Sequence, residues 1–132
     1  MTPQQQLSSD EARGESREKY SKWHRVPNLP YWCYMVDMDW IEMRVRNGEL
    51  VPVAFIEVIT YRGKNIEKAN LEKPLTRAKF ALCKYCEDHS FSTYVVWFNP
   101  NELGTAKFLV QRVGKKPMLM NEAEYKRFLM NL

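Results

Sequence analysis

Two acidic residues, Asp39 and Glu57, have the spacing best suited to chemistry. They lie in two stretches rich in aromatic and β-branched residues, 31–46 and 50–61, which flank an Asn-Gly turn signal at 47–48. We therefore expect a β-hairpin, in which successive side chains alternate between two faces. With a three-residue turn, Asp39 faces Glu57. Three apolar pairs precede them on that face: Val45–Val51, Met43–Val53 and Ile41–Phe55.

Facing carboxylates of this kind indicate a cation site. Their Cβ atoms would lie about 4.5–5.5 Å apart, where like charges repel unless a cation or a proton intervenes. Because Mg²⁺ takes oxygen ligands from one or two carboxylates, Asp39, Glu57 and the carbonyl after Glu57 form a candidate Mg²⁺ or Mn²⁺ site. A two-residue turn would instead put Glu57 out of line with Asp39, leaving two ordinary solvated acids.

The elements that must position these acids follow from the rest of the chain. Residues 1–9 are polar and predict a disordered tail, and 10–132 predict a single domain. After the tail we expect a charged helix over 9–24, an extended Pro-containing linker, the hairpin, a helix over 74–89 opened by Pro74, strands over 93–98 and 106–113, and a last helix capped by Asn121. The fold class is α/β, a mixed β-sheet with flanking helices.

The segments CYMVDMDWIEMRV and LVPVAFIEVITY resemble the core of the PD-(D/E)XK nuclease superfamily, which includes Holliday-junction resolvases and restriction endonucleases. That core is a helix, a hairpin carrying Asp and then Glu-x-Lys, a helix and a further strand. The resemblance implies a restriction-endonuclease-like core in α-β-β-α-β order plus a C-terminal helix, and metal-dependent endonuclease activity on DNA. The family's Asp falls on Asp39, with Asp37 as the less favoured choice, and its Glu on Glu57. Glu18 or Glu15 would supply a further acid from the first helix.

The lysine of Glu-x-Lys is missing, because position 59 is Ile59. In the superfamily this lysine positions and activates the attacking water, and a lysine from the following helix replaces it in some members. Lys79 and Lys84 are the candidates here, and Lys79 is favoured because it lies one turn from the helix start. Without either, the domain would bind nucleic acid but not cut it.

A basic and aromatic group in the first helix offers nucleic-acid contacts through Lys22, His24 and Arg25. Such groups bind phosphates and stack on bases. The alternative is a helix end packed on the sheet.

The cysteines have metal-like spacing. Cys83-x-x-Cys86 with His89 and Cys33 would make a zinc set, but small buried residues on a helix explain the same pattern. We expect Cys83 and Cys86 to be reduced, metal-free and largely buried.

Bulk properties limit the function classes. The net charge of +4, from 20 basic and 16 acidic residues, suits a polyanionic partner such as DNA. No apolar run approaches the roughly 20 residues that span a bilayer, and the N-terminus has no hydrophobic signal, so we expect an intracellular, cytoplasmic protein without a membrane partner. The rivals to a nuclease are a non-catalytic nucleic-acid-binding module and a structural or protein-interaction domain that forms a homodimer.

Overall fold

A computed structural model describes residues 18–20, 22–24, 29–30, 32–33, 35–102 and 107–132. The chain divides into two units, Met1–Met35 and Val36–Leu132, and each is described by itself. In the first unit, residues 18–20 and 22–24 are helical, as predicted for that part of 9–24. The tail predicted over 1–9 lies outside the described residues.

The second unit is built on a five-stranded mixed sheet whose strands lie side by side in sequence order. The strands are β1 (Trp40–Arg46), β2 (Glu49–Thr60), β3 (Ser92–Phe98), β4 (Lys107–Arg112) and β5 (Met118–Asn121). The helical elements are η1 (Ile66–Lys68), α2 (Ala69–Glu72), α3 (Arg77–Asp88), η2 (Pro100–Glu102) and α4 (Glu122–Met130). Only β2 and β3 pair in parallel, since α3 lies on the crossover between them; the other neighbours are antiparallel. The predicted α/β class is confirmed.

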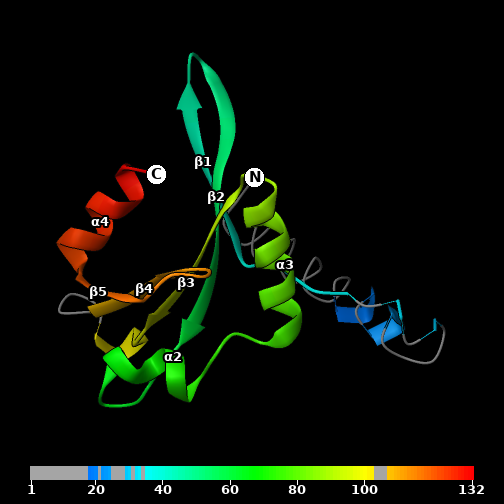
Figure 1. The fold of residues 1–132 in the computed structure, drawn as a ribbon, viewed down its shortest axis with the longest axis horizontal. Coiled ribbons are helices and arrows are strands. Elements are labelled where there is room, and N and C mark those ends of the chain that lie inside the picture. Colours follow the sequence, from blue (N-terminus) through cyan, green and yellow to red (C-terminus); the bar gives the residue numbers. More distant parts are fainter. Residues whose placement is uncertain (1–17, 21, 25–28, 31, 34, 103–106) are drawn as a thin grey trace, which may run out of the picture. The chain divides into compact units, whose positions relative to one another are not determined.

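Both faces of the sheet are covered, and α3 and α4 lie on opposite sides of it (Figure 1). Alternation along β2 divides its side chains between two cores. Ile59 and Tyr61 belong to a cluster around Trp97 that includes residues of η1 and α2. Ile56 and Val58 belong to the cluster that packs under α4. Glu57 therefore points to the face that carries α3.

The hairpin departs from the predicted register at its turn and recovers it further on. The predicted three-residue turn is wrong: Asn47 and Gly48 alone form the turn, with φ angles of 53° and 79°, as a type I′ turn requires. Arg46 therefore pairs with Glu49. A β-bulge in β2, which leaves Val53 without a partner in β1, then adds one residue. From there Ile41 pairs with Phe55, as expected.

Two element boundaries also differ from expectation. The strand predicted over 31–46 begins only at Trp40, because the Asp39 side chain takes the Val58 N–H that a longer β1 would bond through its backbone. The helix predicted from Pro74 begins at Arg77, because Thr76 caps it and its hydroxyl accepts from Lys79 N at 3.4 Å.

Near the C-terminus one element was missed and one prediction is confirmed. The short strand β5 has only four residues after a Gly- and Pro-containing turn, and no strand was expected there. Asn121 does cap the last helix, in a reciprocal capping box with Glu124.

Candidate active site

Asp39 lies directly before β1, in register with Glu57 of β2. Trp40 pairs with Ile56, so the next facing positions along the hairpin are Asp39 and Glu57. Asp39 Oδ2 accepts a hydrogen bond of 2.9 Å from the backbone N–H of Val58. This bond fixes one carboxylate oxygen of an otherwise exposed side chain beside β2.

Glu57 is a buried acid, with 6% of its surface exposed. The next side chain along this face of β2, Ile59, is apolar and packs against the cluster around Trp97. Lys79, from the first turn of α3, places Nζ in contact with Glu57 Oε1 and 3.7 Å from Asp37 Oδ1. Of the two lysines considered from the sequence, Lys79 is the one that reaches Glu57.

The electrostatics of this pair follow from burial and from the neighbouring acids. Burial is the main cause that raises the pKa of Glu57; the hydrogen bond from Lys79 opposes it, while the charge and hydrogen bonding of Asp39 raise the pKa further. Burial lowers the pKa of Lys79, but the hydrogen bond and charge of Glu57, with the charges of Asp37 and Asp39, outweigh it and leave the pKa raised. The charge of Asp39 therefore acts on Glu57 across the hairpin and disfavours its ionised form.

These groups border an open cleft of about 330 Å³ at the carboxyl end of β2. The cleft is lined by Asp39, Glu57, Val58, Ile59, Thr60, Lys73, Pro74, Leu75, Thr76 and Lys79. Nζ of Lys73 donates a hydrogen bond of 3.1 Å to the carbonyl of Thr60, which holds this lysine beside the cleft. A ligand in this cleft can reach both acids and the ammonium of Lys79. The sequence carried no site signal for Lys73 or Thr76, since Lys73 ends a polar connection and Thr76 lies within the helix predicted over 74–89.

The donor set fits a hard cation that keeps most of its water. Two carboxylates in one cleft are the protein ligands that Mg²⁺ commonly takes. In the described part of the chain no three His, Cys, Asp or Glu side chains gather as a metal cage.

Of the remaining predicted site residues, only Lys84 belongs to the unit that contains this cleft. Lys84 is exposed on α3 and makes no contact with the acids. Glu18, Lys22 and His24 lie in the first unit, whose position relative to the second is not defined. Arg25 lies outside the described residues.

The three cysteines are free thiols, as expected for a chain without a disulfide framework. Cys83 is buried, whereas Cys86 is only half-buried, so the expected burial holds fully for one of them. Burial raises the pKa of both thiols. Cys33 belongs to the first unit.

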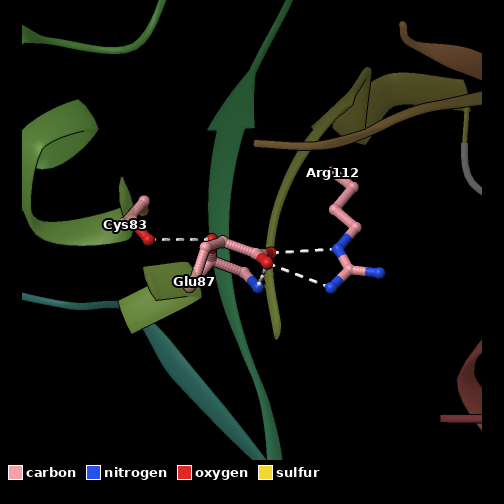
Figure 2. A network of polar contacts seen from close by, with 4 residues as sticks. Cys83, Glu87 and Arg112 are labelled. Carbon is pink, nitrogen blue, oxygen red and sulfur yellow. Dashed lines mark hydrogen bonds and ion pairs between the residues drawn. The ribbon is translucent and has the colours of Figure 1, made fainter. Parts of the chain in front are cut away.

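A second polar network holds the other end of α3 to the sheet (Figure 2). Glu87 accepts two hydrogen bonds of 3.0 Å from the guanidinium of Arg112 and one of 2.8 Å from Thr93 N. The Thr93 hydroxyl lies 3.3 Å from the carbonyl of Cys83. The helix is thus anchored at both ends, by Lys79 to β2 and by Glu87 to β3 and β4, which fixes the Lys79 ammonium over the acids.

Comparison with known proteins gives no family: no family model, no curated protein and no solved structure matches the chain significantly. Among the described helices, none is long and apolar enough to cross a membrane.

Proposed function

We propose that the chain is a metal-dependent nuclease with a restriction-endonuclease-like core, which hydrolyses phosphodiester bonds of DNA at Asp39, Glu57 and Lys79. The observation that carries the proposal is the contact of Lys79 with Glu57, beside Asp39, at an open cleft. Two acids and one lysine are the charged groups that the PD-(D/E)XK resemblance implies, here with the lysine supplied by α3.

Each residue has a separate role in this chemistry. Asp39 and Glu57 would hold one or two Mg²⁺ ions, which when bound polarise the phosphoryl oxygen and lower the pKa of the attacking water. The Asp39–Val58 bond orients the first acid, and β2 holds the second rigidly. The ammonium of Lys79 lies at the cleft, where its positive charge stabilises the negative charge that develops on the phosphate.

The test is cleavage of labelled single-stranded, duplex and branched DNA with Mg²⁺, with Mn²⁺ and with EDTA. The variants are Asp39→Asn, Glu57→Gln and Lys79→Met, each nearly isosteric with the native residue. Lys84→Met is the matched control, because it removes an exposed lysine from the same helix. We expect the three site variants to lose on the order of 10²-fold or more in rate, as is typical when one charged group of such a site is removed, and the control to keep its rate.

Three other outcomes would redirect the proposal. Cleavage that survives both acid substitutions belongs to a contaminant or to another site. Cleavage lost with the acids but not with Lys79→Met excludes the lysine from chemistry. Binding without cleavage on any substrate identifies a nucleic-acid-binding module, the reading that Ile59 favours.

A further inference from the structure

A second hollow adjoins the acidic cleft on the same side of the sheet. Its volume is about 220 Å³, and it is lined by Asn70, Pro74, Leu75, Phe80, Val95, Trp97, Gln111, Val113 and Gly114. Pro74 and Leu75 also line the acidic cleft, so the two hollows share a wall. The hollows differ in charge: the acidic cleft is bordered by two acids and two lysines, whereas the lining of the second is uncharged.

Two aromatic side chains among the described residues line this second hollow, and of these two only Phe80 exposes ring surface to a ligand. Trp97 is 1% exposed, and its indole is fixed by a bond of 2.8 Å from Nε1 to the carbonyl of Lys73. Phe80 of α3 is 49% exposed, so a large part of its ring surface can contact a ligand. Flat aromatic surfaces bind flat ligands by stacking.

Two amides give the hollow its hydrogen-bonding capacity. Gln111 Nε2 donates to the carbonyl of Lys115 at 2.8 Å, which orients the amide, and its Oε1 has no partner among the described residues. The Asn70 side chain makes no hydrogen bond to any part of the chain that the structure describes. Each amide presents a donor and an acceptor, which is the pattern that base edges pair with.

We propose that this hollow binds one unpaired nucleobase of a strand whose phosphate lies in the acidic cleft. The proposal rests on the proposed function and deepens it, because it names the substrate class. A volume below the roughly 300–1,000 Å³ of sites for drug-sized ligands suits a single base. A base stacked inside a duplex cannot enter such a hollow. The substrate is therefore single-stranded nucleic acid, or branched nucleic acid with unpaired bases, in preference to continuous duplex.

The test is binding of labelled single-stranded oligonucleotides in EDTA, measured by fluorescence anisotropy, with one abasic nucleotide moved through each position. We expect one position at which base removal weakens binding to wild type about tenfold, a typical loss for one stacked base. Phe80→Ala should show the same loss on the intact strand and no further loss with the abasic strand, because the two changes remove one shared contact. Gln111→Leu is a second variant, which keeps the aromatic surface and should lose part of the same affinity.

Tyr85→Ala is the matched control: Tyr85 is an aromatic residue of α3 that is 62% exposed and lies outside the hollow. It should bind as wild type does. The proposal would be overturned if wild type bound all abasic strands with equal affinity. It would also be overturned if Phe80→Ala, shown to be folded by circular dichroism, and base removal caused independent losses of affinity. Because EDTA suppresses cleavage, coupling between Phe80 and one base without any Mg²⁺-dependent cleavage would support the base site and refute the nuclease. Cleavage that is lost in Glu57→Gln, without coupling between Phe80 and any base, would support the nuclease and refute the base site.

Discussion

Replacing Lys79 with Met isolates the electrostatic role of the lysine, because Met keeps an unbranched apolar stem and removes the ammonium. Glu57 would stay buried beside Asp39 without its cationic partner. Its side chain is 7% exposed and that of Lys79 is 24% exposed, so solvent screens the pair weakly. Removing one partner of a buried ion pair is destabilising because it leaves an uncompensated charge.

The size of the effect is limited by protonation of Glu57. The variant can always fold with Glu57 protonated. Protonating this carboxyl costs free energy that grows as the pH rises above the ordinary pKa of 4.5. At about 1.36 kcal/mol per unit well above the pKa, the loss in free energy of unfolding is at most about 3.4 kcal/mol at pH 7. At pH 5 it is at most about 0.8 kcal/mol, because part of the unfolded carboxyl is already protonated. We expect about 2–3 kcal/mol at pH 7, which lies below the usual cost of breaking a fully buried pair.

The direction with pH follows from the raised pKa of Glu57. A folded state that binds the proton more tightly than the unfolded state loses stability as the pH rises from 4.5 through the folded-state pKa. Lys79 lowers that pKa in the wild type, so its removal extends and deepens the loss. The variant should therefore approach wild-type stability near pH 5 and fall away from it towards pH 7.

Urea denaturation at several pH values measures this, with the buried Trp97 as a fluorescence reporter of the core. Lys84→Met on the same helix should show no loss at either pH, since Lys84 is exposed. The loss caused by Lys79→Met should largely vanish in a Glu57→Gln background, where no charge is left to compensate. An equal loss at pH 5 and pH 7, or the same loss in that background, would refute the reasoning.

Three further perturbations test how the site is supported. Asn47→Ala should cost about 1 kcal/mol, because Ala at a φ of 53° is strained, whereas Asn47→Gly should be tolerated; denaturant midpoints distinguish the two. Glu87→Gln should make the free energy of unfolding fall less steeply in acid. The hydrogen bonds from Arg112 lower the pKa of Glu87, so the stability that this carboxylate contributes is complete above pH 4.5 and is lost as the pH falls through the lowered pKa. An acid transition that the substitution leaves unchanged would contradict this. Asn121→Ala removes the cap of α4 and should lower the unfolding free energy by about 1 kcal/mol, as measured by urea denaturation at neutral pH, while Asn121→Asp should not.

Local patterns determined most of the elements. Three elements follow from patterns of only a few neighbouring residues: β2 from the alternation in 50–61, β3 from the apolar run near Trp97, and α4 from its Asn121 cap. The Asn-Gly turn was also visible, and its two-residue form is the one that sequence rules favour. The β-bulge was not visible, because a bulge depends on how two strands accommodate each other's twist.

The sequence named the candidate residues, whereas tertiary structure decided how they meet. Asp39 and Glu57 face each other because a shorter turn and the added bulge residue cancel, which no reading of either strand alone reveals. The sequence favoured Lys79 over Lys84 only by its place near the helix start, and the docking of α3, held at its far end by Glu87 and Arg112, brings Lys79 to Glu57. The neighbouring hollow joins residues from α2, α3, β3 and β4 that are far apart in sequence. A sequence specifies local geometry within a turn or a strand, whereas contacts across a sheet depend on register and helix placement summed over the whole fold.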